Sequence, residues 1–88
     1  MEAFEAAKLI VQQPDFPSRV TEGELLYLYA LYKRATCGVA SSVPMPPAFH
    51  PRARKKWNAW KAHDSKTPDD CRAEYTALVA RLQPTDDA

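Results

Sequence analysis

A chain of 88 residues and 9.9 kDa supports one domain with a modest core, because small chains bury a smaller share of their surface than large ones. Its 45% hydrophobic and 26% charged residues are typical of a folded globular protein and argue against intrinsic disorder. The net charge of +1 singles out neither nucleic acid nor a membrane as the partner.

The N-terminal residues and the cysteines indicate the cellular compartment. The first five residues, Met1 to Glu5, hold no basic segment followed by a long apolar run, so we expect neither a signal peptide nor stable membrane insertion. Cys37 and Cys71 fit neither a disulfide framework nor a zinc-binding pattern, and reduced thiols are usual in the cytosol. We therefore predict one cytoplasmic domain over residues 1–88, with no metal site.

The first half of the chain is predicted to hold two helices. Apolar residues at helical spacing predict the first from Glu2 to Gln13, and Pro14 ends it because proline disrupts a helix interior. Residues 21–24 form a capping box, in which the Thr21 hydroxyl accepts from the Glu24 amide and the Glu24 carboxylate accepts from the Thr21 amide. The second helix therefore begins there and ends at Gly38.

The second half predicts a proline-rich loop and two more helices. Four prolines within residues 39–51 indicate an extended connection. Trp57 and Trp60, one turn apart, favour a third helix from about Arg52 to Ala62, and Thr67 with the proline after it starts a fourth. Its apolar stripe consists of Cys71, Tyr75, Leu78, Val79 and Leu82. Four helices without a strand pattern predict an all-α fold, with a short disordered tail from about residue 84.

Two constellations of residues suggest binding rather than catalysis. The run Arg52 to Lys56 places cations at a helix N-terminus, where each costs about 0.3 to 1 kcal/mol unless an anion binds. Tyr29, Tyr32, Lys33 and Thr36 share one face of the second helix, and aromatic rings beside an ammonium group suit a nucleotide-like ligand. The alternatives are a solvated basic surface for the first and core tyrosines for the second.

The chain resembles the acyl-CoA-binding protein family in three separate places. Residues 29–38 resemble its Tyr-x-x-Tyr-Lys-x-Ala-Thr-x-Gly signature, residues 56–60 resemble its Lys-Trp-x-Ala-Trp element, and Tyr75 falls at the expected place in the last helix. The resemblance runs from Phe4 to Leu82. It implies a four-helix bundle in an up-down-down-up arrangement that binds medium- to long-chain fatty acyl-CoA. The implied role is that of a monomeric intracellular carrier or pool former without a cofactor.

The resemblance also implies roles for individual residues. Tyr29, Lys33 and Lys56 are expected to bind the 3′-phosphate of CoA, and Tyr32 is expected to stack on adenine. Tyr75 would lie against the ligand on the opposite wall, and it also belongs to the apolar stripe, so core packing is its alternative role.

Three departures from the family pattern concern the N-terminus and the loop. Where the family often has a lysine close to the ligand, this chain has Gln12, which lacks charge. Lys8 lies one helical turn away and is the candidate to supply that charge instead. Residues 39–42 replace the usual acidic residue and asparagine, which leaves the loop conformation open. The proline-rich segment 44–47 is one residue longer than usual, and its apolar character bears on chain-length preference.

Three other functions can be weighed against the sequence: catalysis, protein interaction and nucleic-acid binding. His50 and His63 have no nucleophile or carboxylate at a motif-like spacing, so we expect no catalytic residues and no enzymatic activity. A helical protein-interaction module with a basic and aromatic surface for an acidic partner is the alternative function. Nucleic-acid binding through Arg52 to Lys56 is disfavoured by the near-neutral net charge, so we expect no nucleic-acid partner.

Overall fold

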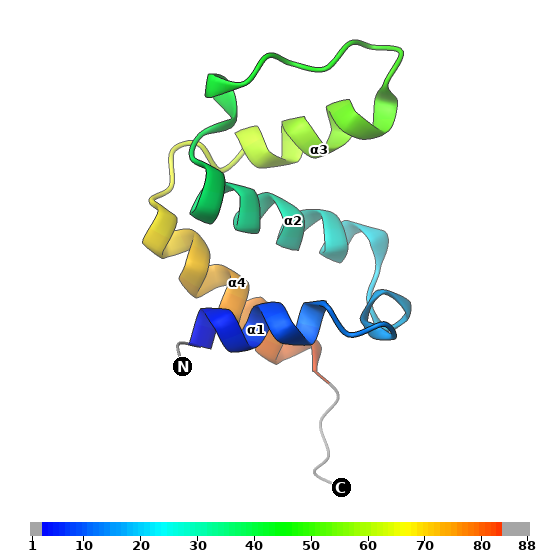
Figure 1. Cartoon of the computed structure of the whole chain (residues 1–88), viewed down its shortest axis with the longest axis vertical. Helices are drawn as coiled ribbons and strands as arrows, with labels where there is room; N and C mark the ends of the chain where they lie inside the picture. The colour runs from blue at the N-terminus through cyan, green and yellow to red at the C-terminus, as the bar shows by residue number, and fades with distance from the viewer. Residues whose placement is uncertain (1–2, 84–88) are drawn as a thin grey trace, which may run out of the picture.

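The computed structural model describes residues 3–83, and this part of the chain folds into helices joined by loops, without a strand (Figure 1). The α-helices are α1 (Ala3–Val11), α2 (Glu22–Cys37), α3 (Pro51–Lys61) and α4 (Pro68–Leu82). Two short 3-10 helices, η1 (Phe16–Arg19) and η2 (Ala40–Ser42), flank α2. The all-α prediction is confirmed, and the tail predicted from about residue 84 lies outside the described residues.

Helix α2 lies at the centre of the arrangement. It packs against α3 on one side and α4 on the other, and α1 packs against α4. In Figure 1, α1 and α4 run in one general direction while α2 and α3 run in the other, which confirms the up-down-down-up arrangement. Because α2 and α3 run the same way, residues 38–50 must return along the length of α3, and this return requires the long loop.

The predicted helix boundaries follow from local chemistry. The hydroxyl of Thr21 accepts from the Glu24 amide at 3.0 Å, and the Glu24 carboxylate accepts from the Thr21 amide at 2.8 Å, which confirms the capping box. Thr67 caps α4 in the same way, accepting from the Asp70 amide at 3.0 Å. Gly38 ends α2 with φ of +89°, a conformation that residues with a Cβ rarely adopt.

The side chains pack into two cores of unequal size. The main core joins α1, α2, α4 and η1, and its buried members are Phe4, Ala7, Phe16, Leu28, Leu31, Ala35, Cys71, Tyr75 and Val79. The second core lies between α3 and η2 and consists of Ala40, Trp57 and Trp60. Phe16 is fully buried, although the sequence interpretation treated the segment after Pro14 only as a connection. Both tryptophans are buried.

The loop after α2 is held by side chains from α3 and the turn that follows it. The indole of Trp60 donates to the carbonyl of Gly38 at 2.9 Å, and that of Trp57 donates to the carbonyl of Val43 at 3.1 Å. The carboxylate of Asp64 accepts from the amides of Ala40 and Ser41 and from the Ser41 hydroxyl. These bonds fix the backbone in the segment where the sequence departs from the family pattern, so the chain has its own means of ordering it.

Candidate functional site

Most of the predicted ligand residues meet in one hollow between α1, α2 and α4. This hollow has a volume of about 370 Å³ and is lined by five of the seven predicted site residues: Lys8, Gln12, Tyr29, Tyr32 and Tyr75. Apolar side chains from α1 and α2 complete its wall: Val11, Leu25 and Leu28. The wall is therefore mainly apolar and aromatic, with one cation and one amide at the α1 side.

Tyr29 links this hollow to the basic surface of α3. The tyrosine also lines a hollow of about 360 Å³ that includes Lys56 and the two tryptophans, and a third of about 550 Å³ that includes Leu26, Arg52 and Lys56. A ligand resting on Tyr29 can thus reach an apolar wall on one side and ammonium and guanidinium groups on the other. We call these three hollows together the Tyr29 site.

Lysine ammonium groups lie over aromatic rings around the Tyr29 site. The Nζ atom of Lys56 is 5.3 Å from the ring centroid of Tyr29, and that of Lys33 is 4.8 Å from the Trp60 ring. Such contacts contribute about 0.5–1 kcal/mol each at exposed sites and hold the cation in place. Within residues 3–83, no carboxylate forms an ion pair with Lys33 or Lys56. Two positive charges are therefore available to an anion beside Tyr29 and Trp60.

Lys33 lies closer to the tryptophan core than its position on the tyrosine face suggested. It does not line the hollow of Tyr32 and Tyr75, but the ring beneath it, Trp60, lines the neighbouring hollow. Thr36, predicted on the same face, donates its hydroxyl proton to the carbonyl of Tyr32 at 2.7 Å. Its hydroxyl is therefore engaged with the helix backbone.

Lys8 and Gln12 lie on the α1 wall, one turn apart as the sequence predicts. The Nζ atom of Lys8 is 3.0 Å from a Glu5 carboxylate oxygen and 6.0 Å from the Tyr32 ring centroid. Because Glu5 partly neutralises it, Lys8 offers less free charge to a phosphate than Lys33 or Lys56 does. Gln12 is exposed and provides an amide.

Tyr75 belongs to the core and to the site wall at once. It is 4% exposed and packs edge-on against Phe4, with ring centroids 5.2 Å apart. Burial, and the nearby hydroxyl of Tyr32, raise the pKa of Tyr75 to about 12, so its phenol is neutral at ordinary pH. Its ring centroid lies 6.5 Å from that of Tyr32, which is exposed and free to stack. The two roles weighed for Tyr75 are thus compatible.

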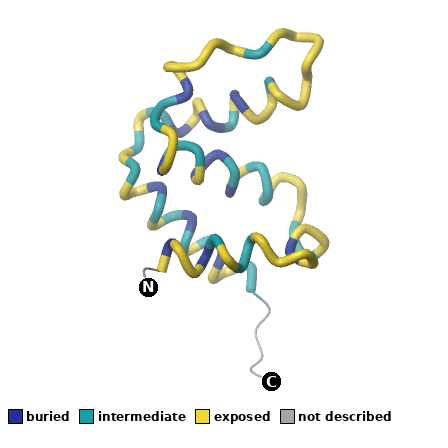
Figure 2. The backbone as a smooth tube through the Cα atoms, viewed as in Figure 1, coloured by how far each residue is buried: buried dark blue, intermediate teal, exposed yellow. Residues whose placement is uncertain are grey.

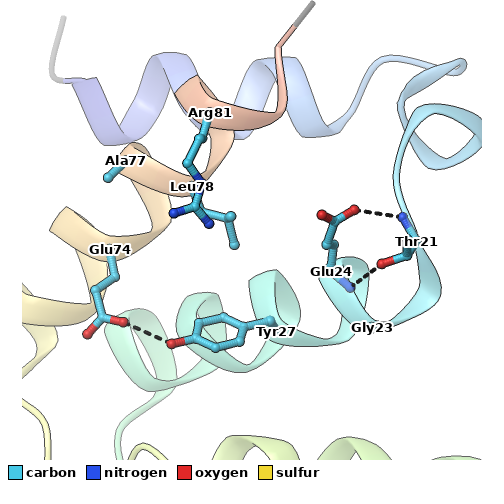
Figure 3. Close-up of a pocket in the computed structure, with 8 residues that line it drawn as sticks. All are labelled: Thr21, Gly23, Glu24, Tyr27, Glu74, Ala77, Leu78 and Arg81. Carbon is cyan, nitrogen blue, oxygen red and sulfur yellow. Dashed lines mark hydrogen bonds between the residues drawn. The ribbon is translucent and has the colours of Figure 1, made fainter.

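A further hollow, on the other side of α2, holds none of the predicted residues (Figure 3). It has a volume of about 500 Å³ between the start of α2 and the second half of α4. Its wall carries two carboxylates, Glu24 and Glu74, and one cation, Arg81; the hydroxyl of Tyr27 donates to Glu74 at 3.1 Å. The Tyr29 site has one carboxylate in its wall, Glu22, and four cations: Lys8, Arg52, Lys55 and Lys56. Because carboxylates repel phosphate and cations attract it, the Tyr29 site suits an anionic ligand better.

Within residues 3–83, no group of three or more His, Cys, Asp or Glu side chains is placed to hold a metal ion. His63 is buried, packs against the Tyr27 ring at 5.1 Å, and its Nδ1 atom has no hydrogen-bond partner in that part of the chain. Burial, reinforced by the charge of Lys66, lowers the pKa of His63. In the same range, no helix is long and apolar enough to cross a membrane.

Comparison with known proteins identifies the family of this chain. The family model described as Acyl CoA binding protein matches residues 1–79. The chain belongs to the acyl-CoA-binding protein family. It is similar to the acyl-CoA-binding protein of Saccharomyces cerevisiae, with 42% identity over 78 residues, covering 89% of this chain and 85% of the yeast protein. The acyl-CoA-binding protein of Ricinus communis is 38% identical over 66 residues, covering 75% of this chain and 72% of that one.

A solved structure extends the comparison to the fold. The crystal structure of Oryza sativa Acyl-CoA-Binding Protein 2 matches with a TM-score of 0.78 and 33% identity, covering 91% of this chain and 84% of that one. The family membership that the sequence motifs indicated and the four-helix fold are both confirmed.

Several residues of the Tyr29 site were absent from the sequence prediction. Leu25 and Leu28 line it because they precede Tyr29 and Tyr32 by one helical turn, a spacing that would have identified them. Arg52 lines it from α3, where the sequence interpretation assigned it only to a basic run. The sequence alone carried no signal for the contact of Lys33 with Trp60, since these residues belong to different helices.

Proposed function

We propose that this chain binds medium- to long-chain fatty acyl-CoA esters in the Tyr29 site and serves as a non-catalytic intracellular carrier or pool former. The observation that carries the proposal is the pair of lysines, Lys33 and Lys56, seated on aromatic rings without a carboxylate partner in residues 3–83. Beside them lies a wall that is largely apolar. A ligand with phosphates at one end and hydrocarbon at the other matches both parts.

The head group is assigned to the boundary between α2 and α3. Tyr29, Lys33 and Lys56 bind the 3′-phosphate, because a phenol donates a hydrogen bond and each ammonium donates one strengthened by charge, worth roughly 1.5 to 3 kcal/mol. Tyr32, which is 38% exposed, stacks on adenine, and Tyr75 supports it from beneath. Lys8 and Gln12 border the ligand from α1, with the Lys8 charge partly neutralised by Glu5.

The acyl tail is assigned to the apolar wall. Leu25 and Leu28 are partly or fully buried yet line the hollow, so hydrocarbon laid over them leaves water. Each methylene buried contributes about 0.8 kcal/mol, which for a long chain amounts to several kcal/mol after the cost of ordering it. Acyl-CoA therefore binds much more tightly than CoA, and free fatty acid, which lacks the phosphates, binds weakly.

The proposal also covers the location of the chain, its oligomeric state and the activities that it lacks. The chain works as a cytoplasmic monomer, requires no cofactor, has no nucleic-acid partner and makes or breaks no bond. Support for a purely binding role comes from the environment of His63, which is buried, has a pKa lowered by that burial and does not line the Tyr29 site.

Calorimetric titration with CoA esters of graded chain length, with CoA and with free palmitate tests the proposal. Affinity should rise with chain length, then level off when the tail outgrows the wall, with CoA and palmitate far weaker. Equal affinity for CoA and its long-chain esters would refute the assignment of the tail. The alternative role as a protein-interaction module predicts no specificity for CoA at all, so the same titration separates the two functions.

A further inference from the structure

The loop between η2 and α3 exposes an unusual concentration of apolar side chains. Of the six large apolar or aromatic side chains that are exposed in residues 3–83, three lie in one seven-residue segment: Val43, Met45 and Phe49. Phe49 is 78% exposed, the highest value in this set, and its ring contacts only the adjacent His50 ring among aromatic groups. Apolar groups left in water at one place commonly mark a surface that another phase or partner covers.

The near-neutral net charge conceals a strong separation of charge along the chain. Residues 25–63 contain seven lysines and arginines and no aspartate or glutamate, whereas all eleven acidic residues lie outside this range. Helix α3 alone carries five of these cations: Arg52, Arg54, Lys55, Lys56 and Lys61. None of the five forms an ion pair within the described part of the chain. The α3 side of the molecule is therefore strongly basic.

The apolar segment and the basic helix lie together at one end of the molecule. In Figure 1 the loop and α3 occupy the top of the longest axis, while α1 lies towards the opposite end, and Figure 2 shows the loop almost wholly exposed. The guanidinium of Arg54 contacts the sulfur of Met45 at 3.0 Å, which joins the loop to the helix. The indole of Trp57 holds the Val43 carbonyl, so the segment is ordered before it meets a partner.

We propose that this end of the molecule docks reversibly on an anionic lipid surface, with Phe49 and Met45 entering the headgroup region and the cations of α3 facing lipid phosphates and carboxylates. Aromatic and apolar side chains gain by leaving water at the interface, and each lysine or arginine near an anionic leaflet contributes about 1 kcal/mol. The prolines at 44, 46 and 47 limit the conformational entropy that the loop loses on docking.

A lipid surface explains the two features together better than another polyanion does. A nucleic acid would use the cations and could stack a base on Phe49, but phosphates and stacked bases do not cover the aliphatic side chains of Val43 and Met45. Binding to an anionic lipid interface strengthens with the apolar area that enters it and with the positive charge beside that area. Phe49 and Met45 line none of the hollows of the Tyr29 site, whereas three α3 cations do: Arg52, Lys55 and Lys56. The unliganded chain is therefore the state in which all five α3 cations can face the lipid.

Vesicle co-sedimentation of the unliganded full chain tests the proposal. Binding to phosphatidylcholine vesicles containing about 30% phosphatidylserine should exceed binding to pure phosphatidylcholine and should fall when salt is raised to about 0.5 M. Phe49→Ser should weaken the partition coefficient about tenfold, and Met45→Ser should weaken it less. Leu9→Ser is the matched control, because Leu9 is 56% exposed on α1, away from the docking end, and this change should leave partition unaltered.

Each outcome decides for or against the lipid assignment. Equal binding to anionic and neutral vesicles, no change with Phe49→Ser, or equal losses with Phe49→Ser and Leu9→Ser would overturn it. Retained binding of an RNA oligonucleotide by Phe49→Ser, at an affinity matching the anionic vesicles, would show a general polyanion surface instead. Circular dichroism and an acyl-CoA titration of Phe49→Ser should match the unmodified chain, which separates failed docking from failed folding or failed ligand binding.

Discussion

Replacing Lys56 with alanine isolates one assigned contact of the Tyr29 site. The side chain is exposed on α3, and its ammonium lies over the Tyr29 ring with no carboxylate partner in residues 3–83. Lys56→Ala should therefore change the free energy of unfolding by no more than about 1 kcal/mol, the upper range of an exposed cation–π contact. The fold should persist, so any effect on binding is local.

The expected loss of affinity follows from the contact that Lys56 makes with phosphate. A charge-assisted hydrogen bond contributes about 1.5 to 3 kcal/mol, which corresponds to a rise of about 10- to 150-fold in the Kd for acyl-CoA. If the contact is with the 3′-phosphate, 3′-dephospho-acyl-CoA already lacks it. The same variant should then change the Kd for the dephospho ester by less than about threefold.

Isothermal titration calorimetry with both esters provides the measurement, and Lys61→Ala provides the control. Lys61 lies on the same helix and carries the same charge, but its ammonium lies over Trp57, 5.9 Å from the ring centroid, and it lines none of the hollows of the Tyr29 site. Lys61→Ala should bind both esters nearly as the unmodified chain does. An unchanged Kd for Lys56→Ala, or equal losses for the two esters, would refute the 3′-phosphate assignment.

Three further predictions concern stability. Gly38→Ala should lower the free energy of unfolding by about 1–3 kcal/mol, because Gly38 has a positive φ that alanine rarely adopts. Gly23→Ala should raise the free energy of unfolding by about 0.5 kcal/mol, because Gly23 lies in a helix and an added Cβ would meet Thr21 Oγ1 at an ordinary 3.8 Å. Urea denaturation measures both changes. Trp60→Phe should cost about 1–2 kcal/mol in the same assay, because the Gly38 carbonyl loses its indole donor. The free energy of unfolding should fall as the pH drops below about 6.5. Burial lowers the pKa of His63 in the folded state, so the unfolded chain binds a proton more readily than the folded chain does. In thermal unfolding, His63→Gln should reduce this dependence of stability on pH.

Distinct results would contradict each of these. A destabilising Gly23→Ala or a neutral Gly38→Ala would mean that the helix ends are formed differently. An unchanged free energy of unfolding for Trp60→Phe would mean that the indole hydrogen bond does not stabilise the loop. The effect of His63 can be separated from that of two carboxylates, Asp64 and Glu74. Burial raises the pKa of each carboxylate, but hydrogen bonding outweighs burial and lowers it. The stability that these carboxylates provide is therefore lost only as the pH falls below about 4, well below the range in which His63 acts. A profile for the unmodified chain that is flat between pH 5 and about 6.5 would contradict the role of His63.

The helices could be predicted because their ends depend on residues close in sequence. Thr21 and Glu24 are three positions apart, and Gly38 acts through its own backbone, so the pattern alone identified them. Part of the site could be outlined for a similar reason, since Tyr29 and Tyr32 share a face of one helix. Lys56 and Tyr75 lie on other helices, and only the family resemblance assigned them to the same ligand.

The unpredicted features depend on residues far apart in sequence. Asp64 orders η2 by accepting hydrogen bonds from the amides of Ala40 and Ser41, which are 24 and 23 positions away. Local sequence patterns do not predict hydrogen bonds between residues so far apart. Phe16 is buried because η1 turns it into the main core, whereas local sequence showed only prolines beside it. The second core likewise forms only when the loop returns over α3.

Mapping the backbone amide chemical shifts of the isotope-labelled chain during titration with dodecanoyl-CoA locates the acyl-CoA site in solution. We expect the largest changes at five residues of the proposed site: Tyr29, Tyr32, Lys33, Lys56 and Tyr75. The hollow of Figure 3, with Tyr27, Leu78 and Arg81, should change little. Largest changes around that second hollow, with the Tyr29 site unaffected, would contradict the claim.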